Sequence, residues 1–323
     1  MGRPETAFWP AAVRQASGSV FHYTSAKGLL GIVPSGTVWA SEASSLNDLA
    51  EVRQGWEAIS RLLVSREDSE ARQLLISLAT HPLDAPHEVF VLSASTAGDD
   101  ANQWRLYADG GRGYALELDG TVQLAAFSAV KAPAPAPSKP GQIDFPALLD
   151  TASVTPWLHV LYAEKEIRTA LDELVATVDG KISDVKRIAT SAEQAQELET
   201  ECDGDAYGAL ATIAHLIKTP GFSGENEVRV VATFLSLRDQ IDYCAGSNGI
   251  IGRATLTQAP GGHRAAVLRP TPSTPATTTT LPLKSVRIGP LLSEEHENTL
   301  KGFLRLHGHD RDIAVTRSKV PLR

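Results

Sequence analysis

Polar side chains stand at the ends of two segments that otherwise predict buried strands. His22, Tyr23 and Thr24 close the first segment, and Glu225 and Glu227 open the second. Alternate residues of an extended strand share a face, so we expect both glutamates on the same side of a sheet. An imidazole and a carboxylate at strand ends can orient sugar hydroxyls and stabilise positive charge that develops in a transition state.

Each of these groups also has a structural interpretation. A buried histidine can hydrogen-bond to the backbone, and Thr24 can cap the start of a helix. Arg229 follows Glu227 on the expected face, where the two could form a surface ion pair worth ~0–1 kcal/mol. The same arginine could instead hold a catalytic carboxylate in its ionised form. The residues alone leave both interpretations open.

Two further segments contain candidate ligand contacts. Asn47 and Asp48 precede a long amphipathic segment that contains Arg53, and Asp48 with Glu51 has the spacing of a helix capping box.

Farther along the chain, Trp104 and Tyr107 flank Arg105. Such a patch can stack on a planar ligand, or it can anchor a core while the arginine extends to solvent.

The elements that must position these residues follow from hydrophobic periodicity and turn signals. We expect strands at residues 19–23, 37–40, 89–93, 113–118, 225–235 and 283–288. We expect helices over residues 26–33, from 47 or 48 to about 65, and over 293–306. Ser93 closes the third of these strands.

The division of the chain follows its composition. Residues 1–130 are predicted to form one half of an α+β core with a mixed sheet, and residues 219–323 the other half, with a Thr/Pro loop at 271–281. Residues 131–142 form an Ala/Pro linker, and residues 143–218 a helical insertion. Segment 164–205 carries twelve acidic and five basic residues, which favours a solvated helical face.

Composition limits the class of protein. The 323 residues are 42% hydrophobic and 21% charged, with a formal net charge of −8, which is typical of a folded globular chain. No apolar stretch is long enough for a membrane helix, and the first residues lack the apolar core of a signal peptide. The two cysteines, Cys202 and Cys244, form no CxxC motif. We therefore expect a cytoplasmic protein without a structural zinc or other metal site.

Common nucleotide-binding and hydrolase motifs are absent from the sequence. It has no phosphate-binding loop, no Rossmann glycine fingerprint, no GxSxG and no HExxH motif. Any chemistry must come from residues that lie far apart in the chain.

The order of these motifs resembles the bacterial DUF2971 family. The resemblance is carried by the segments Phe21–Ser25, Gly31–Ser41, Leu46–Glu51, Leu92–Gly113, Glu225–Val231 and Val286–Pro290. It does not extend to residues 125–142 or to most of the helical insertion. The family name implies no activity.

A second resemblance, to the ADP-ribosyltransferase plan, implies a chemistry. A first strand ending in His-Tyr-Thr and a late strand bearing Glu are similar to that plan, which implies an ADP-ribosyltransferase-like sheet. His22 would then hold the nicotinamide ribose, with support from Thr24. Glu227 would be the catalytic carboxylate, with Glu225 as the alternative. NAD would be the substrate, with no metal required.

The same resemblance assigns roles to the remaining candidates. The DarT-like branch implies an arginine after the first helical region, for which Arg53 is the nearest match. Asn47 and Asp48 would contact the ribose region, and Arg53 or Arg105 the pyrophosphate. Ser93 is a loose equivalent of a Ser-Thr-Ser motif.

The aromatic platform for nicotinamide is left open among Tyr23, Trp104 and Tyr107. The acceptor would be a nucleic acid or a protein. A toxin or phage-defence role, with an antitoxin or defence-system partner, follows by analogy.

Two alternatives remain. The chain could be a non-catalytic module that binds a nucleotide or a partner. It could also be a metal-dependent hydrolase or nuclease that acts through Asp99, Asp100 and Asp109.

Overall fold

The structure is a computed structural model. It describes residues 10–43, 49–64, 69–80, 88–129, 152–234, 241–246, 249–260, 267–268, 279–309 and 313–322. These residues form two compact units. The helical unit contains the described parts of residues 1–14, 46–86 and 159–223. The sheet unit contains those of residues 15–45, 87–158 and 224–323.

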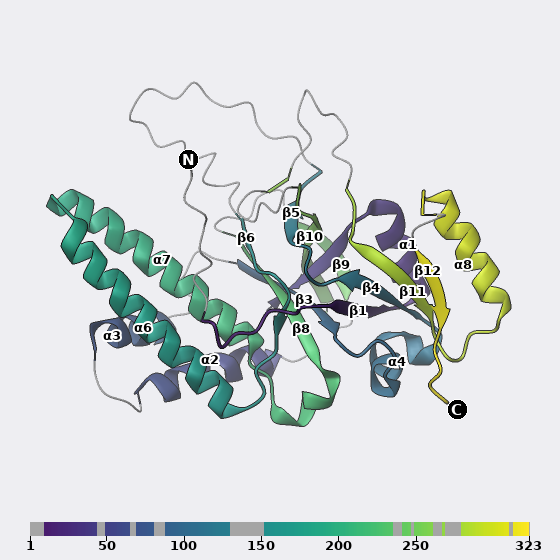
Figure 1. The fold of residues 1–323 in the computed structure, drawn as a ribbon, viewed down its shortest axis with the longest axis horizontal. Helices are drawn as coiled ribbons and strands as arrows, with labels where there is room; N and C mark the ends of the chain where they lie inside the picture. The colour runs from purple at the N-terminus through teal and green to yellow at the C-terminus, as the bar shows by residue number, and fades with distance from the viewer. Residues whose placement is uncertain are drawn as a thin grey trace, which may run out of the picture. The chain divides into compact units, whose positions relative to one another are not determined.

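The helical unit packs four helices together (Figure 1). They are α2 (Leu49–Val64), α3 (Glu70–Thr80), α6 (Glu164–Ile188) and α7 (Ala192–Leu216). Glutamates in the first turn of α6, and Lys186 with Arg187 in its last turn, complement the helix dipole. The side chain of Ser191 caps α7 by accepting from the N–H of Gln194. No helix in the described part of the chain is both long and apolar enough to cross a membrane.

The helical unit combines two segments that are distant in the sequence. The sequence analysis grouped residues 1–130 together, whereas α2 and α3 pack against α6 and α7. The ring of Trp56 on α2 stacks on that of Tyr207 on α7, with centroids 6.2 Å apart. Gly55 allows this approach, because a Cβ at that position would lie 2.2 Å from the carbonyl oxygen of Ala214.

The sheet unit contains a mixed, mostly antiparallel sheet, which confirms the predicted α+β class. Its path within the described residues runs β12-β11-β4-β1-β3-β2-β10-β5, with β8 also on β3, β6 and β7 on β8, and β9 on β10. The strands are β1 (Ser19–Thr24), β2 (Val38–Glu42), β3 (Glu88–Ser95), β4 (Tyr114–Asp119), β5 (Leu124–Phe127), β6 (Ala152–Val154), β7 (Leu158–His159), β8 (Glu227–Phe234), β9 (Ile241–Gly246), β10 (Gly249–Gln258), β11 (Leu283–Ile288) and β12 (Ala314–Arg317).

One face of this sheet carries the main apolar core. Val20, Phe90, Leu92, Val228 and their same-face neighbours pack into one buried cluster. The strand register places them on one side, because directly opposed residues of an antiparallel pair share a face. We call this side the core face.

The opposite side, the α4 face, carries more polar side chains. It presents Tyr23, Ser95, Glu227 and Arg229, and the short helix α4 (Ala101–Tyr107) packs against it through Trp104. On the core-face side, α1 (Ala26–Ser35) and α8 (Glu295–Leu306) pack on β4 and β11. Ser25, and not Thr24, caps α1, and Gly36 ends it with a φ of 59°.

Most predicted elements are confirmed within a few residues of their expected ends. The strand at 283–288 matches β11, and the helix after residue 48 ends at Val64. The helical insertion was predicted to span residues 143–218, but β6 and β7 occupy residues 152–159. These short strands pair with β8, and their pairing depends on contacts that local periodicity does not encode. The linker at 131–142 and the loop at 271–278 lie outside the described residues.

Replacing Phe90 tests whether the core around β3 holds the sheet together. Its ring is fully buried and meets that of Phe234 edge to face, with centroids 5.5 Å apart. We expect Phe90→Ala to lower the free energy of unfolding by ~3–5 kcal/mol, because it leaves a cavity. Urea titration would measure the change. A loss below ~1 kcal/mol would contradict the packing described here, and Phe222→Ala, at a half-exposed ring, is the control.

Candidate functional site

The sheet opens where two strands share one edge of β3. β1 meets β3 through the pair Phe21–Ser95, whereas β2 meets it through Ser41–Val91 and Glu42–Phe90. Ser93 lies between these two points, and its side chain is exposed. We call this place the β1/β2 junction.

His22 reaches into the junction from β1. Its Nδ1 lies 3.1 Å from the carbonyl oxygen of Ser93. A carbonyl only accepts, so Nδ1 carries the proton and donates it. Burial lowers the pKa of His22, and the hydrogen bond to Ser93 opposes that shift in part. The ring is therefore neutral near pH 7, and its Nε2 is an acceptor.

The main chain of Tyr23 also faces the junction. Successive residues of a strand direct their N–H and C=O groups alternately to the strand on one side and to the strand on the other. The carbonyl of Gly18, just before β1, accepts from the N–H of Gly120 on the β4 side. The backbone groups of Phe21 and Tyr23, an odd number of residues later, therefore point towards β3. The β1–β3 ladder includes Phe21 but does not reach Tyr23. Both groups of Tyr23 therefore face the junction, beyond the last pair of the β1–β3 ladder.

Glu227 begins β8 and forms a buried ion pair with Arg229. The Nε of Arg229 donates to Oε1 at 2.7 Å, and Nη2 donates to Oε2 at 3.1 Å. Glu227 is 6% exposed and Arg229 4% exposed. Residues i and i+2 share a strand face, so the predicted same-face relation between Glu227 and Arg229 is confirmed. The pair keeps the carboxylate ionised and oriented.

Glu225 does not belong to that strand. β8 begins at Glu227, and Asn226 between them has a φ of 48°, which interrupts the extended backbone. The prediction that both glutamates alternate along one strand is therefore wrong. The Glu225 carboxylate accepts from the hydroxyl of Tyr107 at 3.2 Å, and its carbonyl accepts from Ser95 Oγ at 2.6 Å.

The three aromatic candidates have different surroundings. Trp104 is fully buried, and its ring meets that of Tyr23 edge to face, with centroids 4.9 Å apart. The Tyr23 hydroxyl donates to the carbonyl of Ala97 and accepts from the N–H of Asp100. These two rings hold α4 on the sheet. Tyr107 is 45% exposed, and Arg105 is exposed on the same helix.

The acidic residues next to α4 have structural partners. Asp99 accepts from Trp104 Nε1, Ser318 Oγ and the N–H of Lys319, which fixes the C-terminal segment against α4. Asp100 caps α4 by accepting from the N–H groups of Asn102 and Gln103.

Asp109, exposed, follows α4 with a φ of 50°. Within the described residues, no group of at least three His, Cys, Asp or Glu side chains could hold a metal ion.

The structure does not assign the remaining predicted contacts to the junction. Arg53 is exposed on α2, in the helical unit. Asn47 and Asp48, with the predicted capping box, lie outside the described residues. Thr24 is half-buried at the end of β1, and its Oγ1 occupies the space next to Gly28.

Two residues that the sequence analysis did not select lie beside the junction. Trp39 on β2 is 50% exposed, although its neighbours Val38 and Ala40 are buried. Counting on from the pair Ser41–Val91, Trp39 lies at the level of Ser93 on the α4 face. The guanidinium of Arg253 stands 5.3 Å from the centre of the Trp39 ring. A large aromatic within a short strand signal could have drawn attention to Trp39, but Arg253 had no local signal.

His22 and Glu227 lie on opposite faces of the sheet. The register aligns His22 with Ala94 and Val228, and it aligns Glu227 with Ser95. A ligand lying over only one face would reach only one of them.

Comparison with known proteins identifies part of the chain. Residues 103–230 match the sequence model of a family described as "Protein of unknown function (DUF2971)". This match, over less than half of the chain, supports the resemblance to DUF2971. The match includes α4, the two long helices of the helical unit and the start of β8 with Glu227. No curated protein and no solved structure gives a significant match.

The residues that match the DUF2971 model include only some of the residues on which the sequence-based resemblances rest. Trp104, Tyr107 and Glu227 fall within the matched residues, whereas His22 and Trp39 precede them. The strands that form the junction, β1, β2 and β3, all precede the matched residues, whereas β8, on the other edge of β3, begins within them. The resemblance of residues 21–51 and 286–290 to the family stays a prediction.

The low pKa of His22 predicts a pH dependence of stability. In the unfolded chain His22 has a pKa of about 6.5, whereas in the folded protein its pKa is lower. Below about pH 6.5 the unfolded state therefore binds more protons than the folded state. The free energy of unfolding should therefore fall as pH drops below about 6.5. We expect a smaller fall for His22→Gln, measured by urea titration at pH 7.5 and 5.5. Equal falls in both proteins would contradict a neutral, buried His22, and His159, whose pKa burial also lowers, contributes to both.

Proposed function

We propose that the chain is an NAD-consuming ADP-ribosyltransferase that binds its dinucleotide at the β1/β2 junction. The observation that carries the proposal is the open edge of β1, where the N–H and C=O of Tyr23 lie beyond the ladder with β3. A primary carboxamide offers an acceptor and a donor side by side, which complements those two groups. Nicotinamide, the group released from NAD, carries such a carboxamide.

The exposed ring of Trp39 supports this placement. It lies beside the open edge, at the level of Ser93, and half of its surface is accessible. An aromatic face of this kind can stack on the nicotinamide ring. Tyr23 and Trp104, two of the three rings first considered, are buried and committed to contacts with each other.

The polar groups around the junction fit the bond that must break. Loss of nicotinamide leaves positive charge on the ribose, so a carboxylate near the sugar stabilises the transition state more than the ground state. The pair with Arg229 holds the Glu227 carboxylate ionised and oriented. His22 Nε2 can accept from a ribose hydroxyl. In this proposal the ligand occupies the opening between the strands, and the sheet is of ADP-ribosyltransferase-like type.

The wider role follows only from the chemistry proposed. The acceptor of ADP-ribose would be a nucleic acid or a protein. Modification of either in the host cell would suit a cytoplasmic toxin or phage-defence effector, held in check by an antitoxin or another defence-system partner.

Nicotinamide release tests the proposed reaction. Purified protein with NAD, and with cell lysate as a source of acceptor, should release nicotinamide, measured by chromatography. Glu227→Gln should reduce the rate at least ~100-fold, because the variant removes the negative charge that stabilises the sugar cation. Release at the wild-type rate by the folded variant would exclude Glu227 from catalysis.

The control for this variant concerns the buried arginine. Removing one partner of a buried ion pair costs ~3–5 kcal/mol, so Glu227→Gln alone could unfold the protein. The double variant Glu227→Gln/Arg229→Gln removes both charges of this ion pair and keeps hydrogen-bonding groups at both positions. It should fold and remain inactive, and thermal unfolding would verify the first point.

Trp39 should affect binding of the nicotinamide ring. We expect Trp39→Ala to weaken NAD binding about 5- to 50-fold, by loss of ~1–2 kcal/mol of stacking, while Trp39→Phe keeps most of the affinity. Isothermal titration calorimetry with NAD would measure this. Because half of the ring is exposed, the fold should tolerate the change, and Phe222→Ala, at another half-exposed ring, is the control. Unchanged affinity in Trp39→Ala would remove the ring from the site.

A non-catalytic binding module remains the alternative. The commitment of Glu227 to Arg229 is the observation in its favour, because an ion-paired carboxylate can serve structure alone. NAD binding that depends on Trp39, without nicotinamide release in the presence of lysate, would select this function.

A further inference from the structure

Arg253 has the features of an ordered anion-binding residue beside the junction. It lies on β10, directly opposite Ser41 of β2. Its Nε donates to Cys244 Sγ at 2.8 Å, and its Nη1 donates to Ser41 Oγ at 3.2 Å. With the Trp39 ring 5.3 Å away, the guanidinium is held from three directions.

The charge of Arg253 is not neutralised by direct contact in the described part of the chain. No carboxylate there forms an ion pair with it, although Asp242 stands opposite on β9. The Asp242 carboxylate instead accepts from the hydroxyl of Thr255 at 3.3 Å. An arginine has five N–H donors in a fixed plane, so the donors on Nη2 and one on Nη1 remain for a ligand.

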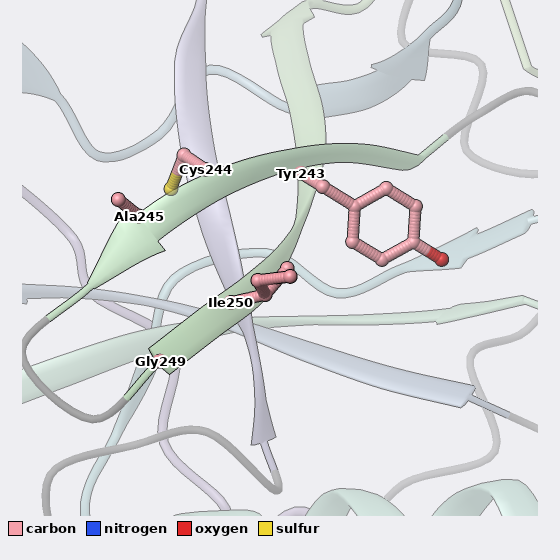
Figure 2. A pocket seen from close by; sticks show the side chains of 5 residues that line it. All are labelled: Tyr243, Cys244, Ala245, Gly249 and Ile250. Carbon is pink, nitrogen blue, oxygen red and sulfur yellow. The ribbon is translucent and has the colours of Figure 1, made fainter.

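The neighbours of Arg253 are suited to orient it without competing for a ligand. Cys244 and Ser41 supply uncharged acceptors, so they fix the plane of the guanidinium and leave its positive charge available. Cys244 also lines a shallow surface pocket with Tyr243 and Ile250 of the β9–β10 hairpin (Figure 2). An ordered arginine loses little conformational entropy on binding, and planar N–H pairs match phosphate oxygens.

We infer that Arg253 binds the diphosphate of a nucleotide whose ring stacks near Trp39. This inference deepens the proposed function, since NAD joins its two nucleosides by a diphosphate, and it assigns that group to Arg253 rather than to Arg53 or Arg105. The ligand class is set by an exposed aromatic ring and an ordered guanidinium with unused N–H donors, side by side on one sheet face.

Comparison of ADP with adenosine tests the inference without any catalytic step. Calorimetry should show that wild-type protein binds ADP more tightly than adenosine. Arg253→Gln should weaken ADP binding at least about tenfold and leave adenosine binding unchanged, because only ADP has the diphosphate that a charge-assisted hydrogen bond requires. Arg305→Gln, an equal change of charge at an exposed position on α8, should leave both unchanged.

Variants of Cys244 test how Arg253 is oriented. Cys244→Ala removes the acceptor for Nε and should weaken ADP binding several-fold, whereas Cys244→Ser keeps an acceptor and should restore it. Thermal unfolding of each variant would verify that the protein is folded.

The outcomes separate this inference from the proposed function. Equal losses for ADP and adenosine in Arg253→Gln, no loss for ADP, or no ADP binding by wild-type protein would each overturn the assignment of the diphosphate. Nicotinamide release is measured separately. If ADP binding depends on the diphosphate but no nicotinamide is released, the assignment of Arg253 stands and the transferase function is rejected. If nicotinamide is released at the same rate by wild type and Arg253→Gln, the transferase function stands and the assignment of Arg253 is rejected.

Discussion

The arrangement of the sheet unit depends on how the two edges of β3 are shared. A strand has one row of hydrogen-bonding groups on each side, and β8 occupies one side of β3 along its whole length. β1 and β2 must divide the other side, with β1 at Ser95 and β2 at Val91 and Phe90. Between them, the carbonyl of Ser93 is paired with neither strand's backbone, and a side chain must donate its hydrogen bond. The imidazole of His22 meets that requirement, which explains a histidine on an otherwise apolar face.

The second constraint is the buried charge on β8. Glu227 and Arg229 are buried on the α4 face of the sheet, beside the polar residues of β3, where neither would be tolerated alone. The positive φ of Asn226 turns the chain into β8 directly before this pair, and the carbonyl of Asn226 accepts from the N–H of Thr96. The entry of the strand and the position of the carboxylate are therefore fixed together.

Local patterns were sufficient for the elements and insufficient for their pairing. Alternation predicted β1, β4 and β11, and the amphipathic period predicted α2 and α8. The short strands β6 and β7 gave no such pattern, because two or three residues are too few for a period. Likewise, His22 and Glu227 were recognisable as residues out of place in strands. Their position on opposite faces depends on a register that only the assembled sheet defines.

The candidate site was therefore only partly predictable. Ser93 and the pair of Glu227 with Arg229 were found from sequence, because polar residues in apolar runs are conspicuous. Trp39 was not selected, because an aromatic residue in a strand is ordinary until its exposure is known. Arg253 depends on three neighbours from two other strands, so no short segment of sequence could indicate its surroundings.

The sharing of β3 also governs when the protein can fold during synthesis. The partners of β3 begin at Ser19 and continue to Phe234, and β2 is completed by β10, which ends at Gln258. A ribosome must therefore produce most of the chain before the central strand has both its edges satisfied. Until then the hydrogen-bonding edges of β3 lack partners, so we expect the sheet unit to complete its folding late and to be prone to aggregation before that point.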